Sequence, residues 1–330
     1  MNRRDTVLAL LALGGAGTPV AAGAQQSKGK TAHIGILVGG SISQRGHLEQ
    51  ALLEGLRDQG YVEGKNLTVE RRYADGRNER VPEYARELAA MGLDAVVTTC
   101  TPSTRAARQA NTSTPIVMAA VADPVGQRLI TSLARPGANI TGLSSQAEDI
   151  LPKMLEMFSG VLLKPATVAV FAQENSDVHP RMWLQLVPIA QTLKVRLAKI
   201  EVAYAADLSV AFDMLLREKA TAVFLLPDEP MFLTRRARIV ELAANHRLPA
   251  FYGAREFVDE GGLMSYGENL RAAYRKAATY LNSLARGVKA GDLPVEQPTK
   301  FEFVINLKTA KDLGITIPQL LLAQADHVIQ

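Results

Sequence analysis

The feature that most constrains the fold is a regular alternation of short apolar runs with segments of helical spacing. Residues 33–38 are apolar and β-branched and end at two glycines, as a buried strand does. Apolar residues then recur at helical spacing over 48–56, and Gly60 follows in the position favoured after a helix end. Because strands separated by helices form parallel sheets with helices on both faces, the sequence predicts an α/β fold.

The alternation runs through the chain twice. The first run predicts strands over 33–38, 67–73, 95–99, 115–121 and 139–143, with helices over 81–91, 104–110 and 124–133. The second predicts strands over 167–171, 195–202, 222–226, 249–252 and 263–266, with helices over 153–159, 179–193, 208–219, 232–246 and 270–286. A late strand over 301–305 and a helix over 307–313 indicate that the chain recrosses between two α/β domains of similar build.

Charge and cysteine content narrow the class of protein. The chain has 330 residues, 37 basic and 33 acidic, with no long run of either sign, so no nucleic-acid partner is predicted. Its length suits two domains of ordinary size. Cys100 is the one cysteine of the sequence, so an intramolecular disulfide is excluded, and its apolar surroundings predict a buried structural residue.

The N-terminus predicts export. Arg3 and Arg4 precede a mostly apolar run over 7–20, and Ala22-Gly23-Ala24 provides a small-x-small cleavage site. The apolar run is shorter than the roughly 20 residues that span a bilayer. We therefore expect residues 1–24 to be a cleavable signal peptide, exported by either the Sec or the Tat route, and the mature protein to be periplasmic.

Candidate ligand-binding residues follow the predicted strands. Ligands of open parallel sheets bind beyond the carboxyl ends of the strands, where helix N-termini offer free N–H groups. Hydroxyls there suit a ligand carboxylate, an aspartate suits an ammonium group, and tyrosines can form walls. Many of the same side chains would also serve as helix caps, and both roles stay open. The predicted set is Ser41, Ser43, Thr101, Ser103, Thr104, Asp123, Ser144, Ser145, Asn175, Asp228, Tyr252 and Tyr266.

Motifs of enzymes and cofactor sites are not found in the sequence. It contains no G-x-x-x-x-G-K-[ST] phosphate loop, no dinucleotide fingerprint after the first strand and no G-x-S-x-G elbow. The five histidines are scattered, without a pair at metal-ligand spacing. We therefore predict no catalytic residues, no cofactor and no metal site.

Several short segments of the sequence resemble motifs of one known protein family. Residues 55–66 read GLRDQGYVEGKN, and matching phrases lie at 116–126, 133–142, 249–253, 261–267 and 293–310. They resemble the ABC-transporter substrate-binding proteins of the tryptophan/tyrosine type, over essentially the whole mature chain. The resemblance implies a type I periplasmic-binding-protein architecture, in which two Rossmann-like lobes with parallel sheets are joined by three crossovers. The first lobe would comprise 30–143 and about 268–295, and the second 144–267 and about 296–330.

The resemblance implies a solute-binding protein. Such a protein captures a small organic ligand, here expected to be an amino acid and in family relatives an aromatic one, and delivers it as a monomer to an ABC-transporter permease in the inner membrane. We expect hinge closure around the ligand, with its carboxylate held by Thr101, Ser103 and Ser144 and its ammonium group by Asp228.

Two other functions stay open on the sequence. One is a periplasmic module that presents its ligand-bound state to a signalling receptor, which would have the same fold. The other is an exported hydrolase, which would need His47 or His179 beside a serine in the cleft.

Overall fold

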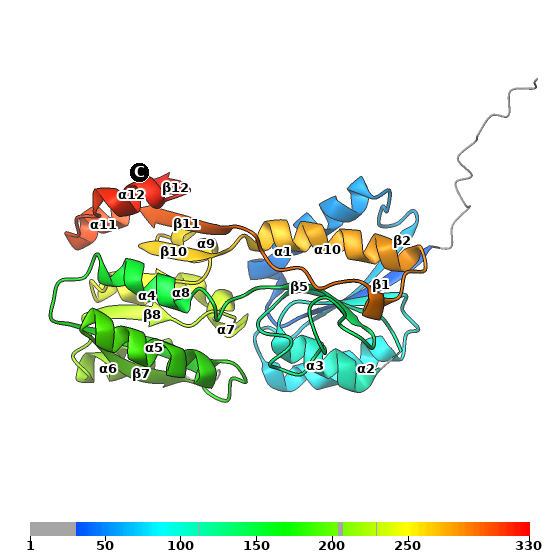
Figure 1. Ribbon diagram of the computed structural model, residues 1–330, viewed down its shortest axis with the longest axis horizontal. Coiled ribbons are helices and arrows are strands. Elements are labelled where there is room, and N and C mark those ends of the chain that lie inside the picture. The colour runs from blue at the N-terminus through cyan, green and yellow to red at the C-terminus, as the bar shows by residue number, and fades with distance from the viewer. Residues whose placement is uncertain (1–30, 112, 204–206, 229) are drawn as a thin grey trace, which may run out of the picture. The chain divides into compact units, whose positions relative to one another are not determined.

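The structure is a computed structural model that describes residues 31–330 except 112, 204–206 and 229. The predicted signal peptide, residues 1–24, lies outside the described residues. The chain from Ala32 to Gln330 forms one compact unit built on two β-sheets, one of five strands and one of seven (Figure 1). The predicted α/β class is confirmed.

The five-stranded sheet is parallel throughout and carries helices on both faces. One face packs against two long helices that contact each other, and the opposite face packs against two shorter ones. The strand order is β2 (Leu67–Tyr73), β1 (Ala32–Val38), β3 (Ala95–Thr98), β4 (Ile116–Val121) and β5 (Ile140–Ser144). The long helices are α1 (Ile42–Asp58) and α10 (Leu270–Ala285), and the shorter ones are α2 (Val81–Ala89) and α3 (Thr101–Ala110), with a 3-10 turn η1 (Asn78–Arg80) before α2.

The seven-stranded sheet is parallel except where β11 runs antiparallel to β10. Its strand order is β12 (His327–Ile329), β11 (Phe301–Asn306), β10 (Met264–Glu268), β9 (Ala250–Tyr252), β8 (Ala222–Leu225), β6 (Ala166–Gln173) and β7 (Val195–Val202). One face is covered by α4 (Leu151–Ser159), α5 (His179–Leu193), α11 (Leu307–Leu313) and α12 (Gln319–Gln324). The other is covered by α6 (Leu208–Arg217), α7 (Pro230–Thr234), α8 (Arg236–Asn245) and α9 (Arg255–Asp259).

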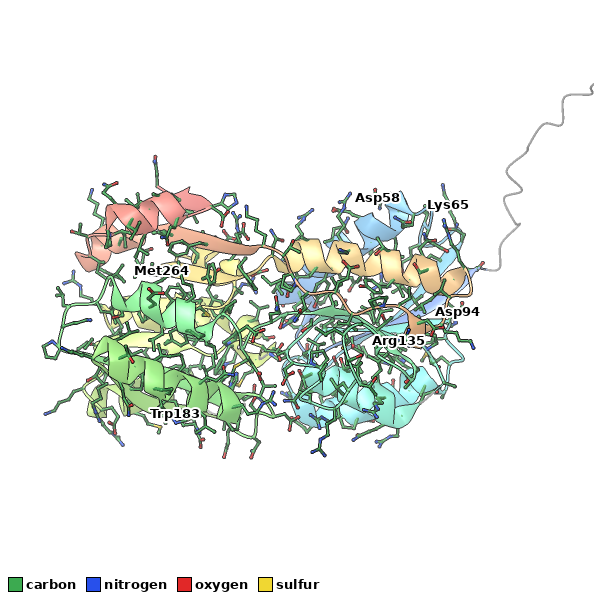
Figure 2. All side chains as sticks on the ribbon, in the orientation of Figure 1. Asp58, Lys65, Asp94, Arg135, Trp183 and Met264 are labelled. Atoms are coloured by element: carbon green, nitrogen blue, oxygen red, sulfur yellow. The ribbon has the colours of Figure 1, made fainter. Side chains whose placement is uncertain are left out.

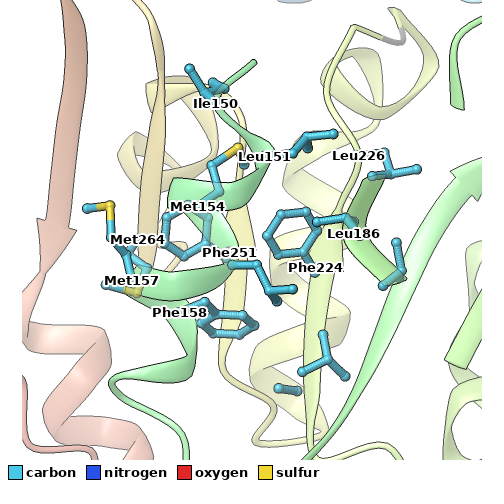
Figure 3. Packing of buried hydrophobic residues seen from close by; sticks show 14 of the residues in the cluster. Ile150, Leu151, Met154, Met157, Phe158, Leu186, Phe224, Leu226, Phe251 and Met264 are labelled. Atoms are coloured by element: carbon cyan, nitrogen blue, oxygen red, sulfur yellow. The ribbon is translucent and has the colours of Figure 1, made fainter. Parts of the chain in front are cut away.

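Aromatic rings fill the core between α4 and the seven-stranded sheet. Phe158 from α4 lies over Phe224 of β8 and Phe251 of β9, with ring centroids 6.4 and 5.5 Å away. Figure 3 shows Met154 and Met157 of α4 beside these rings. Because all of these side chains are almost fully buried, the strand positions that carry them are fixed relative to α4.

The chain passes between the two sheets three times. It leaves β5 through residues 145–150 to reach α4, passes directly from β10 into α10, and returns from α10 to β11 through residues 286–300, which include the 3-10 turn η2 (Ala290–Asp292) (Figure 1). The third passage lies beside the first, because Ser144 donates its N–H to the carbonyl of Glu296 at 2.9 Å. The three crossovers expected from the resemblance are confirmed.

Some predicted elements differ from the structure. The helix predicted over 124–133 is wrong, since this segment forms turns. The Asp123 carboxylate accepts the Gly126 N–H at 2.8 Å, and Arg128 has a left-handed φ of 56°, which interrupts helical geometry. The helix predicted over 232–246 is two helices, α7 and α8, separated at Arg235. The short elements α9, α12 and β12 were not predicted, because three to six residues carry little periodic signal.

The described part of the chain contains no helix with the length and apolar character needed to cross a membrane.

Candidate functional site

A cavity lies at the carboxyl ends of strands from both sheets. Residues after β3 and β5, near the end of β4, after β8 and β9, and at the end of β10 contribute to its walls. Strands of parallel sheets end at a common edge, so side chains distant in sequence meet there. The enclosed space is about 90 Å³. The lining residues are Arg45, Thr99, Cys100, Ala120, Ser145, Ala147, Ile150, Leu225, Leu226, Pro227, Asp228, Pro230, Phe232, Leu233, Gly253, Ala254, Phe257, Glu268, Leu270 and Tyr274.

Most of this wall is apolar. Leu225, Leu226 and Phe232 line it from the seven-stranded sheet and its helices, and Leu270 lines it from the start of α10. The chain's single tryptophan, Trp183, lies instead on α5, where it packs against the core of the seven-stranded sheet (Figure 2). An apolar wall with a few polar groups is the usual composition of a small-molecule site.

Asp228 joins the two sides of the cavity. It follows β8 in a left-handed conformation, with φ of 69°, and its Oδ2 accepts a hydrogen bond from Thr101 Oγ1 at 3.1 Å. Thr101 is the first residue of α3, on the other sheet. Burial raises the pKa of Asp228 to about 7, although the Thr101 hydroxyl and the charge of Arg45 oppose this rise. The carboxylate is therefore only partly ionised at neutral pH.

Glu268 is a second acidic side chain in the same cavity. It is the last residue of β10. Burial, with a smaller contribution from the negative charge of Asp228, raises the pKa of Glu268 to about 8. Its Oε2 is buried and has no hydrogen-bond partner among the residues that the structure describes. A buried carboxylate oxygen without a partner is costly, so this position suits a donor from a ligand.

Arg45 and Ser145 supply donors to the cavity. Arg45 is 7% exposed, and its Nη1 donates to the Tyr274 hydroxyl at 3.2 Å. The Nε of Arg45 and the Oγ of Ser145 are buried and lack partners among the described residues. The cavity therefore combines two unpartnered donor groups with two carboxyl groups, which suits a ligand that has both an anionic and a cationic end.

His179 fixes the loop that carries Asp228. Its Nδ1 accepts the backbone N–H of Gln173 at 2.8 Å, so Nδ1 is unprotonated and Nε2 carries the proton. Nε2 lies 2.9 Å from the carbonyl oxygen of Pro227, to which it donates. Burial lowers the pKa of His179 to about 4, so the ring is neutral at physiological pH. A neutral imidazole thus ties the end of β6 to the residue before Asp228.

Three of the predicted binding residues line the cavity or contact a residue that does. Two others, Ser103 and Thr104, bond the backbone at the start of α3 instead. Asp228 and Ser145 line the cavity, and Thr101 contacts Asp228. The Ser103 hydroxyl accepts the N–H of Cys100 at 3.2 Å, and Thr104 Oγ1 bonds the carbonyl of Cys100 at 3.0 Å. These two hydroxyls organise the start of α3.

The remaining predicted residues do not line the cavity. Ser41 and Ser43 lie 3.1 Å apart, oxygen to oxygen, before and within the first turn of α1. Asn175 is exposed and has a left-handed φ of 60°. Asp123 pairs with Arg181, and Ser144 lines a separate cavity beside that pair. Tyr252 stacks on Phe257 at 4.6 Å, and Tyr266 packs against Phe301 and Phe303.

Several polar cavity residues were absent from the sequence prediction, among them Thr99, Glu268, Arg45 and Tyr274. Glu268 is the last residue of a strand, and Asp228 follows the end of another strand closely. The expectation that ligands bind at strand ends could therefore have indicated Glu268 as well. Arg45 and Tyr274 lie inside α1 and α10, where a helical pattern indicates packing rather than a site. No sequence signal separates them from other helix residues.

The hydrolase alternative gains no support from the two histidines that it requires. His47 Nε2 lies 3.3 Å from Glu256 Oε1, and both ring nitrogens of His179 bond backbone groups. Within the described ranges, no group of three or more His, Cys, Asp and Glu residues is arranged to hold a metal ion.

One family model matches almost the whole described chain, and several known proteins are similar to it. The model of the family described as ABC transporter substrate binding protein matches residues 34–329. A tyrosine-binding protein of Clostridioides difficile (strain R20291) is 23% identical over 96% of this chain and 94% of its own length. The crystal structure of a conserved domain protein from Vibrio cholerae is 28% identical with a TM-score of 0.82, over 91% of this chain and all of the other. An ABC domain from Streptococcus pneumonia in complex with L-Trp is 24% identical with a TM-score of 0.79, over 90% of this chain and all of the other.

Proposed function

We propose that this chain, which belongs to the family of ABC transporter substrate-binding proteins, captures an amino acid between its two sheets and delivers it, in the periplasm, to an inner-membrane permease. The observation that supports this function is the cavity itself. Its walls come from both sheets, and Thr101 of α3, beside one sheet, donates a hydrogen bond to Asp228, which follows a strand of the other. A ligand in that position would bridge the two sheets and stabilise their closed arrangement, which the permease would recognise.

The ligand is proposed to be an amino acid with an apolar, preferentially aromatic, side chain. The apolar wall suits the side chain, and the names of two relatives refer to tyrosine and L-Trp. The ammonium group is assigned to Asp228. We assign the carboxylate to Arg45 and Ser145 rather than to Thr101, Ser103 and Ser144, because Thr101 donates to Asp228, Ser103 caps α3 and Ser144 lies outside the cavity.

Binding requires the cavity to widen. Its enclosed 90 Å³ is below the roughly 300–1,000 Å³ of typical ligand sites. We propose that two lobes, residues 30–143 with about 268–295 and residues 144–267 with about 296–330, move apart about the three crossovers to admit the ligand. A monomer suffices for this cycle, since both walls of the cavity belong to one chain.

The first test is native mass spectrometry of residues 25–330 purified without denaturation. A co-purified mass equal to tyrosine, tryptophan or another amino acid would support the proposal and name the ligand. An empty protein that also shows no thermal shift with any of the common amino acids would remove the amino-acid assignment.

Asp228→Ala tests the ammonium assignment. We expect this change to weaken binding of tyrosine or tryptophan at least tenfold, because a charge-assisted hydrogen bond of about 1.5–3 kcal/mol is lost. The matched control is Asp213→Ala on the exposed face of α6, which should leave affinity unchanged. Isothermal titration calorimetry measures both. Equal affinities for the two variants would show that Asp228 does not hold the ligand.

A further inference from the structure

Two glycines that follow β1 lie directly against a helix of the other sheet. A Cβ at Gly39 would lie 2.7 Å from Cγ of Pro230, the first residue of α7. A Cβ at Gly40 would lie 2.9 Å from Oγ1 of Thr234, the last residue of α7. Strand β1 belongs to the five-stranded sheet, and α7 covers the seven-stranded one. The absence of side chains at the two glycines therefore lets the two sides of the molecule meet at this point.

The side chain of Arg45 reaches the same point from α1. Its Cδ and its Nε would each lie 2.8 Å from a Cβ at Gly40. Arg45 is 7% exposed, so its guanidinium group is held almost entirely out of water. Arg45 Nε and Thr234 Oγ1 are thus neighbours that come from opposite sides of the molecule.

Both of these polar atoms lack a partner. Arg45 Nε and Thr234 Oγ1 are buried, and neither makes a hydrogen bond to the other or to any residue that the structure describes. Two buried polar groups left without partners side by side cost free energy. Because the two atoms lie 2.8 and 2.9 Å from one point above Gly40, they are close enough for a single oxygen to accept from both.

The chemistry around Gly40 favours an anion as the missing partner. Arg45 Nε can only donate and the Thr234 hydroxyl can also donate, so the group that suits both is an acceptor. Gly40 directly precedes Ser41, the N-cap residue of α1, whose side chain makes no capping bond within the described residues. The positive end of α1 is therefore next to Gly40, and it favours negative charge there. Arg45 itself lines the ligand cavity, so the two spaces are continuous.

We propose that an oxygen of the ligand carboxylate is held between Arg45 Nε and Thr234 Oγ1, above Gly40. The proposal rests on the proposed function of the cavity and deepens it, because it adds a binding residue, Thr234, from outside the enclosed cavity. Since Arg45 is on α1 and Thr234 is on α7, the carboxylate would join the helices of the two sheets. A carboxylate has a second oxygen, so this assignment is compatible with the donor role of Ser145.

Thr234→Val tests the proposal, because valine keeps the shape of threonine and removes the hydroxyl. The probes, titrated into the mature chain by calorimetry, are L-tryptophan, tryptamine, which has no carboxylate, and indolepropionate, which has no ammonium group. We expect Thr234→Val to weaken binding of tryptophan and indolepropionate at least about fivefold and to leave tryptamine binding unchanged. Thr234→Ser, which restores the hydroxyl, should bind tryptophan within about twofold of the wild type.

The unfolding temperature of the ligand-free protein separates a binding role from a structural one. Because Thr234 Oγ1 has no partner before the ligand arrives, Thr234→Val should leave Tm unchanged or raise it. Gly40→Ala keeps both polar groups but places a methyl group between them, so it should weaken tryptophan binding at least about tenfold and tryptamine binding less. If Thr234→Val fails to fold, Gly40→Ala provides the comparison. Thr192→Val, at an exposed position of α5, is the matched control and should leave the affinity for all three probes unchanged.

Each outcome decides between the two proposals. Tryptophan and indolepropionate binding that Thr234→Val weakens, with tryptamine binding unchanged, supports both. Equal tryptophan affinity in the wild type and Thr234→Val, or an equal loss for tryptophan and tryptamine, overturns the inference and leaves the function intact. Binding of indolepropionate alone, weakened in Thr234→Val, supports the inference and rejects the amino-acid assignment. Binding of none of the three probes to the wild type overturns both.

Discussion

At the scale of single residues, the site depends on side chains that hold other groups in place. His179 does not itself line the cavity, yet its two nitrogens join the backbone at Gln173 to the backbone at Pro227, which does. Its ring also stacks on Phe232, which does line the cavity, with centroids 6.1 Å apart. The conformation of the Asp228 loop therefore depends on a neutral, fully hydrogen-bonded imidazole.

His179 should make stability depend on pH. Its pKa of about 4 in the folded chain lies below the ordinary 6.5, so the unfolded chain takes up the proton first as pH falls. The contribution of the ring is complete above pH 6.5 and is lost as pH falls toward 4. His179→Gln does not titrate, so the advantage of the wild type over this variant should shrink by about 2 kcal/mol between pH 7 and pH 4.5. Urea unfolding at both pH values measures it. A constant advantage would show that the ring is not held neutral.

At the scale of elements, the packing of α1 against α10 is set by a glycine. A Cβ at Gly55 would lie 2.3 Å from the carbonyl oxygen of Arg275 and 3.0 Å from the Cβ of Ala278. The absence of a side chain therefore lets the two helices approach to backbone contact. The ion pairs of Arg275 and Arg271 with Glu54 continue the same interface toward the surface.

Two glycine substitutions in α1 should have opposite effects. Gly55→Ala should destabilise the chain by about 1–3 kcal/mol, because the new methyl group forces α1 and α10 apart. Gly46→Ala is the matched control on the same helix, since its Cβ would meet nothing nearer than 4.0 Å. It should stabilise the chain by up to about 1 kcal/mol through helix propensity. Thermal unfolding compares them, and equal Tm shifts would contradict the packing role of Gly55.

The elements also show what could be predicted from the sequence. Strands such as β4, buried along their whole length, were predicted within a residue because a continuous apolar run bounded by turn residues has few alternatives. Residues 124–133 misled the prediction because Pro124 resembles a helix start, whereas side-chain bonding by Asp123 favours a turn. Strand ends indicated Asp228 and Ser145, but Arg45 and Tyr274 reach the cavity from helices, and only their packing against the sheets shows this.

At the scale of the whole molecule, ion pairs join the parts that carry the two walls of the cavity. Arg181 of α5 pairs with Asp123, which follows β4, and with Glu148 at 3.1 Å. Arg105 of α3 pairs with Asp177, which precedes α5, at 3.3 Å. Apart from the buried Glu148, these side chains are partly exposed, so each exposed pair contributes at most about 1 kcal/mol. Together they join the two sheets without lining the cavity.

Removing both pairs of Arg181 should shift the balance between closed and open forms. Arg181→Ala should increase the mean radius of gyration of the ligand-free protein and weaken ligand binding about two- to fivefold. Arg238→Ala, which removes a similarly exposed pair within α8, is the control and should change neither. Small-angle X-ray scattering and calorimetry measure the two effects. An unchanged radius for Arg181→Ala would indicate that these pairs do not hold the sheets together.

The threefold passage of the chain also has a consequence for how the protein is made. Helix α10 covers the same face of the five-stranded sheet as α1, through Tyr274, Ala277 and Leu281, but it is synthesised after most of the seven-stranded sheet. A nascent chain that ends at β5 therefore has all five strands, but α1 alone covers the face that α10 later completes. The five-stranded sheet is therefore synthesised first but gains its last covering helix only after residue 285 has been made. Until then part of its apolar face is exposed, and such exposed surface promotes aggregation.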